Sequence, residues 1–211
     1  MNKKTIIIVA VVAIIAVVLG IISGYNSAAK QDATKQDATK QDASKASNLS
    51  ISSADDLTIL VDKIYEGVSI EMPMLMTMPV DTTDVDAVKS FTGLDSAENI
   101  EYAVVSEPMM SSQAYSMVLV KVKDGADADA IAKAMNENID ERKWICVTAE
   151  KIYTTTSGNV ICLVMTNAET AQPVFESFKT NAGSVGKVYE RTAEVPEMPE
   201  DMLPGQDGLA Y

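Results

Sequence analysis

The sequence has no histidine among its 211 residues. Histidine is the commonest general base and the commonest metal ligand in proteins, so its absence removes the usual serine and cysteine triads and most zinc sites. Carboxylate and lysine chemistry stay open, but no phosphate loop, nucleophile elbow or nucleic-acid-binding motif accompanies them. We therefore expect a non-catalytic protein without a cofactor, with an enzyme of unrecognised type as one alternative.

Aromatic residues and cysteines are also scarce. Aromatics make up 5% of the chain, so a core has to be built mainly from aliphatic side chains and methionine. The two cysteines, Cys146 and Cys162, do not form a CxxC pair. We expect two buried free thiols. A disulfide is the alternative, because an extracytoplasmic location would permit one.

Positive charge is in short supply over most of the chain. The formal net charge is −13, and residues 46–211 alone carry −16. Such a surface is repelled by the phosphates of nucleic acids and by anionic lipid headgroups. We therefore expect no nucleic-acid partner, and only loose attraction for cations or basic proteins.

One long apolar run is present at the N-terminus. After Lys3 and Lys4, residues 5–25 carry no charge, and as a helix they would extend roughly 30 Å, enough to cross a bilayer. The two lysines predict a single-pass signal-anchor over residues 1–25, with a cytoplasmic N-terminus and the remaining chain extracytoplasmic. The alternative is a secreted protein cleaved after the small residues that end at Ala29.

Two polar segments flank the central part of the sequence. Residues 26–52 contain the repeat KQDATKQDATKQDASK, whose five-residue period cannot form an apolar helix stripe, so this segment reads as a disordered linker. Residues 190–211 contain three prolines among acidic residues and carry a net charge of −5, which indicates a disordered tail.

Residues 53–189 show the patterns of an α+β domain. Apolar residues spaced as on one helix face follow capping residues such as Ser53, and short apolar runs flank turn residues such as Gly158. The predicted helices cover residues 52–68, 82–93, 124–144 and 167–183, and the predicted strands cover 100–106, 114–122, 150–156 and 160–166.

The order of these elements indicates two related halves. At an offset of 43 residues, Val118 matches Ile161 and Met135 matches Phe178. The order β-β-α-β-β-α favours a mostly antiparallel four-stranded sheet covered by helices on one face.

The stretch EMPMLMTMP is the most unusual one in the domain. It places Met72, Met74, Met76 and Met78 at alternate positions, so an extended chain would direct all four side chains to one face. We expect them to pack in or against the core, which has few aromatics. The alternatives are a partner-binding surface and a Cu(I) site made of thioethers, because soft ligands suit Cu(I).

Two acidic groups are weaker candidates. Asp124, Asp127 and Asp129 in DGADAD lack the glycine position and the distal glutamate of a calcium loop, so they are expected to cap a helix. Asp55 and Asp56 are adjacent on a helix and point about 100° apart, which suits a solvated first turn better than joint acid–base catalysis.

The segments SEPMMSSQAYSMVLVKVKDGADADAIAKAMNENIDER and KIYTTTSGNVICLVM resemble clostridial envelope proteins grouped as domain of unknown function 4358. The resemblance covers roughly residues 54–180, about 60% of the chain. It implies an extracytoplasmic protein of a Gram-positive cell envelope, and it transfers no catalytic residue. Many members of that family are lipoproteins, whereas this chain has no lipobox cysteine. We expect a binding or organising role toward an envelope partner, with copper handling through the methionines as the second alternative.

Overall fold

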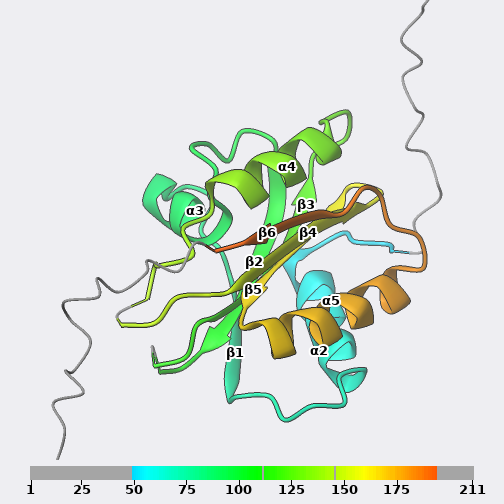
Figure 1. The fold of residues 1–211 in the computed structure, drawn as a ribbon. Helices are drawn as coiled ribbons and strands as arrows, with labels where there is room; N and C mark the ends of the chain where they lie inside the picture. The colour runs from blue at the N-terminus through cyan, green and yellow to red at the C-terminus, as the bar shows by residue number, and fades with distance from the viewer. Residues whose placement is uncertain (1–48, 111, 145, 194–211) are drawn as a thin grey trace, which may run out of the picture. The chain divides into compact units, whose positions relative to one another are not determined.

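The computed structural model describes residues 49–110, 112–144 and 146–193. In this part of the chain, four helices and six strands form an α+β fold (Figure 1). The helices are α2 (Ala54–Glu66), α3 (Val85–Thr92), α4 (Ala128–Asn138) and α5 (Ala168–Ala182). The strands are β1 (Leu75–Pro79), β2 (Ile100–Pro108), β3 (Tyr115–Val122), β4 (Lys151–Ser157), β5 (Val160–Thr166) and β6 (Tyr189–Thr192).

The six strands form one antiparallel sheet in the order β1-β2-β3-β5-β4-β6. The central strands β3 and β5 are buried at every position. Their sequences, YSMVLVKV and VICLVMT, are apolar on both faces, as expected for strands with helices above and below them. The predicted sheet contained only the four inner strands, and the structure adds β1 and β6 as the two edges.

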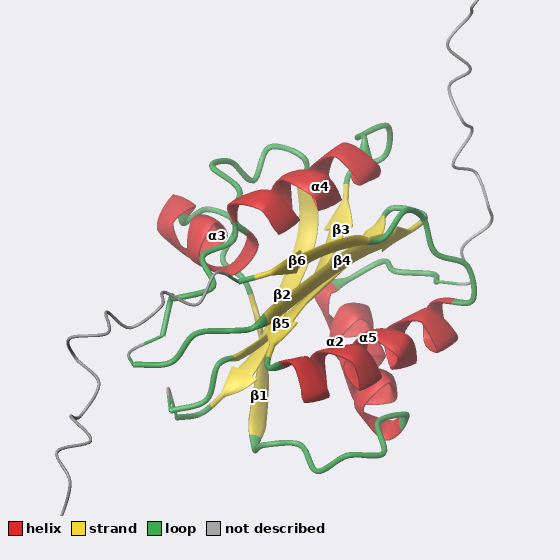
Figure 2. Ribbon diagram, in the orientation of Figure 1, coloured by secondary structure: helices red, strands yellow, loops and turns green. Residues whose placement is uncertain are grey.

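Helices cover both faces of the sheet (Figure 2). Helices α2 and α5 pack on one face through a cluster that includes Leu57, Phe178 and Cys162, and helices α3 and α4 pack on the other through Val88 and Met135. The prediction of helices on one face was therefore wrong. Val118 and Ile161 do share a face, but the helices that follow their strands pack on opposite faces, so the two halves are not structural repeats.

The helix ends follow from local sequence. Ser53, Asp84, Asp127 and Asn167 each accept a hydrogen bond from a backbone N–H in the first turn of a helix, as an N-cap does. Gly93 ends α3 in the left-handed conformation, with a φ of 75°. Val85, the first residue of α3, is 58% exposed, whereas Val88 one turn later is buried.

The domain extends beyond both expected boundaries. Leu49 and Ile51, which were assigned to the linker, pack against the cluster under α2 and α5. Strand β6 pairs with β4 across residues that were assigned to the acidic tail. The expected boundary at 189/190 falls inside this strand.

No helix in the described part of the chain is long and apolar enough to cross a membrane. The predicted membrane segment of residues 5–25, the repeats up to residue 48 and the tail from residue 194 lie outside the described residues.

Candidate functional site

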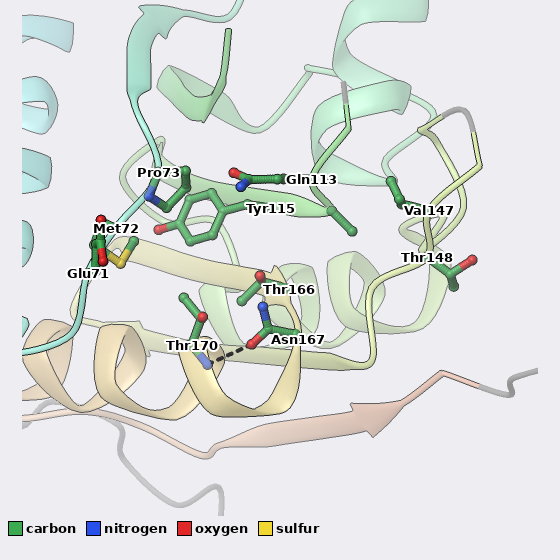
Figure 3. A pocket seen from close by; sticks show the side chains of 11 residues that line it. Glu71, Met72, Pro73, Gln113, Tyr115, Val147, Thr148, Thr166, Asn167 and Thr170 are labelled. Carbon is green, nitrogen blue, oxygen red and sulfur yellow. Dashed lines mark hydrogen bonds between the residues drawn. The ribbon is translucent and has the colours of Figure 1, made fainter. Parts of the chain in front are cut away.

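A cleft of about 480 Å³ opens at the end of the sheet where β3 starts and β5 ends (Figure 3). Four segments form its walls: residues 71–73 before β1, residues 113–115 at the start of β3, residues 147–148 before β4, and residues 166–170 at the junction of β5 and α5. The antiparallel register brings them together, because Tyr115 lies directly opposite Thr166.

The first turn of α5 forms one wall of the cleft. Asn167 caps the helix, and its Oδ1 accepts a hydrogen bond from the Thr170 N–H at 2.9 Å. The carboxylate of Glu150 accepts another from the Ala168 N–H at 3.0 Å. A helix N-terminus attracts anions through its free N–H groups and its dipole. Here a carboxylate of the chain itself already occupies that position, so this turn is a poor site for an external anion.

The cleft lining is polar and almost without charge. Among the described residues that line it, Glu71 alone carries a formal charge. The other polar groups are the amides of Gln113 and Asn167 and the hydroxyls of Tyr115, Thr148, Thr166 and Thr170. Such groups both donate and accept hydrogen bonds, so they suit a ligand rich in hydroxyl or amide groups.

Tyr115 is the buried aromatic residue of the cleft wall. Its hydroxyl donates a hydrogen bond to the hydroxyl of Tyr65 at 3.0 Å. Burial raises the pKa of Tyr65 to about 12 and raises the pKa of Tyr115 well above its usual value. Both phenols are therefore neutral at physiological pH. Neither is poised to act as a base there, because a general base needs a pKa near the working pH.

A buried charged cluster lies on the face of the sheet that α3 and α4 cover. The Nζ of Lys143 is 2.5 Å from Oε1 of Glu107 and 3.2 Å from Oγ of Ser116. It also lies 5.0 Å from the centre of the Phe91 ring and 5.3 Å from that of Trp144. Burial lowers the pKa of Lys143, and the Glu107 carboxylate opposes that shift.

A serine and a lysine within hydrogen-bond distance form a known nucleophile–base combination. Ser116, however, has no exposed surface, and Lys143 is held by its carboxylate partner, so no substrate carbonyl can reach the hydroxyl. The cluster therefore fixes the loop before β4 onto the sheet. Sequence reasoning missed it because its members are far apart along the chain, and only the strand register brings Glu107 and Ser116 together.

The predicted methionine group does not share one face. Met72 packs against the cluster under α2 and α5, and Met78 packs against the cluster under α3 and α4. Met74 and Met76 are 78% and 44% exposed, so core packing was the wrong expectation for these two. Only Leu75–Pro79 forms a strand, so Met72 and Met74 lie outside its regular alternation of side chains. Met76 lies within β1, at the edge of the sheet.

The acidic groups take different roles. Asp127 caps α4, as predicted. Asp129 accepts a hydrogen bond from the Tyr189 hydroxyl at 2.8 Å, and Asp124 accepts one from Asn159 at 3.2 Å. No group of three or more acidic or cysteine side chains in the described residues is arranged to hold a metal ion.

The first turn of α2 also follows the prediction. The hydroxyl of Ser53 accepts a hydrogen bond from the Asp56 N–H, and the Asp56 carboxylate accepts two from Ser52. These hydrogen bonds from Ser52 lower the pKa of Asp56. Its carboxylate is thus occupied in holding the helix start.

Both cysteines are free thiols. Cys162 is fully buried between the sheet and the α2/α5 layer, as expected. Cys146 is exposed, which corrects the expectation of two buried thiols. It has a positive φ of 66° in the loop before β4.

Comparison of the chain with protein-family models, with curated proteins and with solved structures gave no match.

Proposed function

We propose that this protein is a membrane-anchored binding module of a Gram-positive cell envelope, in which the cleft at the end of the sheet receives part of an envelope partner. The resemblance to the family of domain of unknown function 4358 supports the envelope location. The role is non-catalytic, and the ligand group in the cleft carries hydroxyls or amides.

The observation that carries this proposal is the chemistry of the cleft. It combines about 480 Å³ of space with amide and hydroxyl groups, and its described lining residues include no cysteine, no lysine and no pair of carboxylates. A binding site needs a few polar groups that converge on the ligand and an apolar wall. In this cleft Met72, Pro73 and Val147 supply the apolar wall. A hydrolase or transferase would also need a nucleophile with its base, or two acid–base groups.

The N-terminal sequence supports the proposed location. Lys3 and Lys4 ahead of residues 5–25 favour a cytoplasmic N-terminus, and the acidic domain does not oppose translocation, because acidic residues contribute little to orientation. Trypsin added to intact protoplasts is expected to cut the repeats at Lys35, Lys40 and Lys45 and release the domain. Protection of the domain until lysis would reverse this orientation.

Site-specific photocrosslinking in whole cells tests the cleft. A photoreactive side chain replaces Gln113 or Thr148, both of which are exposed at the rim, and the same group replaces Ile59 on α2 as a control. We expect specific adducts from the two rim positions and none from position 59. Thr170→Trp fills the cleft and should suppress the adducts. Mass spectrometry of the adducts would distinguish a protein partner from wall glycan.

The proposal is contradicted by either of two results. Adducts of equal yield from position 59 would mean that crosslinking reports general proximity. Cleft adducts that persist in the Thr170→Trp variant would mean that the partner contacts the rim without entering the cleft.

A further inference from the structure

Strand β1 forms one edge of the sheet, and no strand of the described residues pairs with its outer side (Figure 1). Just past its end, the backbone N–H of Val80 donates to the carbonyl of Ala103 at 2.9 Å, in the same register as the β1–β2 pair. Hydrogen-bonded and non-hydrogen-bonded pairs alternate along an antiparallel ladder. Leu75, Thr77 and Pro79 therefore direct their backbone polar groups away from β2.

These outward groups have no partner within the described part of the chain. Outside the β1–β2 ladder, no backbone hydrogen bond of the described residues involves Leu75, Thr77 or Pro79. Pro79 has no N–H to offer, and an outward position on an edge strand is one that tolerates proline. Leu75 and Thr77 thus each present a free donor and a free acceptor, and Pro79 presents a free acceptor.

The two edges of the sheet differ in their protection. Natural edge strands avoid unwanted pairing through charged side chains, prolines and short length. Strand β6 has Glu190 and Arg191 among its four residues, and both form ion pairs. Strand β1, with the sequence LMTMP, has no charged residue, its proline stands at the last position, and Met76 is 44% exposed. The β1 edge is therefore the one that another strand can reach.

Acidic residues flank β1 on both sides. Residues 67–88 include Glu71, Asp81, Asp84 and Asp86 but no lysine or arginine. All four carboxylates belong to exposed residues, and no ion pair between described residues neutralises any of them. A second copy of the chain, paired antiparallel through β1, would bring its own acidic flanks beside these. Such like-charge contacts oppose association, so the charge favours a basic partner over a second copy.

We infer that β1 pairs with an extended segment of a basic protein partner, which lengthens the sheet by one strand. In strand addition, main-chain hydrogen bonds give affinity, and side chains at alternate positions give specificity. Leu75 packs on the α2/α5 side and Met78 on the α3/α4 side, so the added strand meets apolar surface on both faces. Its basic residues lie at the end beside Asp81. This inference goes beyond the proposed function and does not depend on the cleft.

Amide hydrogen exchange, followed by NMR on the purified full-length protein in detergent, tests whether the edge is free. The amides of Leu75 and Thr77 should exchange more than about tenfold faster than those of Met76 and Met78, which bond to β2. Slow exchange at Leu75 and Thr77 in the isolated protein would overturn the inference, because the edge would already be covered. This measurement needs no variant.

Photocrosslinking in whole cells tests the partner. A photoreactive side chain replaces Met76, and the same group replaces Val188, which is 41% exposed beside β6, as a control. Position 76 should give an adduct with a protein segment that contains lysine or arginine, and position 188 should give none. Thr77→Pro removes an outward N–H but no β1–β2 hydrogen bond, and it should lower the adduct yield about tenfold.

Matched variants assign that loss to the backbone. Thr77→Val keeps the N–H and removes only the hydroxyl that bonds to Ser106 at 3.1 Å, so it should keep the adduct. Thr170→Trp, which fills the cleft, should also keep it, and Asp81→Lys should lower it. Thermal unfolding of each variant confirms that it is folded.

Three results would overturn the inference. The adduct could survive in Thr77→Pro, which would mean that the partner does not use the outward N–H. It could disappear in Thr77→Val or Thr170→Trp, which would assign it to a side chain or to the cleft. It could also contain a second copy of the chain or a lipid instead of a basic segment of another protein.

Discussion

Lys143 carries its ammonium group into the α3/α4 side of the domain, where its side chain is only 10% exposed and that of Glu107 is 20% exposed. Removing two charges from water is unfavourable, and their mutual attraction with added hydrogen bonds offsets that cost only when both partners are present. The hydroxyl of Ser116 and the aromatic rings of Phe91 and Trp144 complete the surroundings of the ammonium group. This residue therefore stabilises the fold as half of a pair.

Replacing one partner should be far more harmful than replacing both. We expect Lys143→Met to lower the free energy of unfolding by about 3–5 kcal/mol, because it leaves Glu107 as an uncompensated buried charge. Lys143→Met/Glu107→Leu should recover most of that loss. Urea unfolding of the parent, both single variants and the double variant gives the coupling energy. Additive single effects would show that the two charges are solvated separately.

The paired phenols predict a defined pH dependence. Burial raises the pKa of Tyr65 to about 12 in the folded protein and raises that of Tyr115 well above its usual value, whereas an unfolded tyrosine ionises near its ordinary value of about 10. The stability that they contribute is fully present below the unfolded pKa and is lost as the pH rises through the folded pKa. Stability should therefore fall above about pH 10.

Urea unfolding at a series of alkaline pH values measures this effect. In Tyr65→Phe/Tyr115→Phe the loss of stability above about pH 10 should be smaller, because two fewer groups ionise on unfolding. Tyr153→Phe is the control, because Tyr153 lies outside the pair. It should not change the part of the pH dependence of the unfolding free energy that Tyr65 and Tyr115 cause. An unchanged slope in the double variant would assign the alkaline loss to other groups.

Among the elements, those with a local cause were predictable. The helices α2, α3, α4 and α5 begin at side-chain caps, and the β4–β5 hairpin turns at Gly158, whose φ is 59°. Strands β1 and β6 were missed because each is short, and prolines or acidic residues dilute its pattern. They form by pairing with β2 and β4. Four or five residues of sequence are too few to show that pairing as a pattern.

Local sequence patterns also did not predict on which face of the sheet each helix packs. A signal for two covered faces was nevertheless present, because β3 and β5 are apolar at consecutive positions instead of alternating. The cleft depends on the same long-range pairing, because Tyr115 meets Thr166 only through the sheet register. The candidate site could therefore not be assembled from sequence spacing.

The end of α3 provides a test of packing at the level of one element. Gly93 has a φ of 75°, and a Cβ built on it would lie 2.5 Å from the backbone nitrogen of Ile139 at the end of α4. Gly125 has a similar φ of 84°, but a Cβ there would meet no atom within 4 Å. We expect Gly125→Ala to cost about 1–2 kcal/mol, from the left-handed backbone alone. Gly93→Ala should cost about 1–3 kcal/mol more, because α3 and α4 must also separate.

Thermal and urea unfolding of the two glycine variants measure this difference. Gly125→Ala reports backbone strain alone, and Gly93→Ala reports backbone strain together with steric overlap against α4. Equal destabilisation at the two positions would mean that α3 can move away from α4 without cost. A selective loss at Gly93 would establish that the α3–α4 contact is held at backbone distance.

At the scale of the whole molecule, the chain ends of the domain complete its core. Strand β6 forms the outer edge next to β4, and Arg191 joins it to α4. The Arg191 guanidinium donates to the carbonyl of Asn136 at 2.9 Å and to that of Ile139 at 2.6 Å, and it pairs with Glu141 at 2.7 Å. A single side chain thus satisfies carbonyl groups at the end of a helix that would otherwise lack partners.

The domain limits follow from these contacts and can be tested with two fragments. Residues 49–193 keep Leu49, Ile51 and β6, and this fragment should unfold in one cooperative transition. Residues 52–188 lack all three, so we expect a lower unfolding midpoint and a less cooperative transition.

Two single substitutions in the longer fragment separate the causes of that loss. Arg191→Ala should reproduce much of it, because each lost hydrogen bond from a charged group costs about 1.5–3 kcal/mol. Glu190→Ala is the matched neighbour on the same strand. It removes only a partly exposed pair with Lys151, so it should cost less than about 1 kcal/mol. If the shorter fragment proves as stable as the longer one, β6 is an accessory strand and the core ends at β5 and α5. If Arg191→Ala is as mild as Glu190→Ala, the end of α4 is held by packing of Met135 and Ile139 on the sheet and not by the guanidinium.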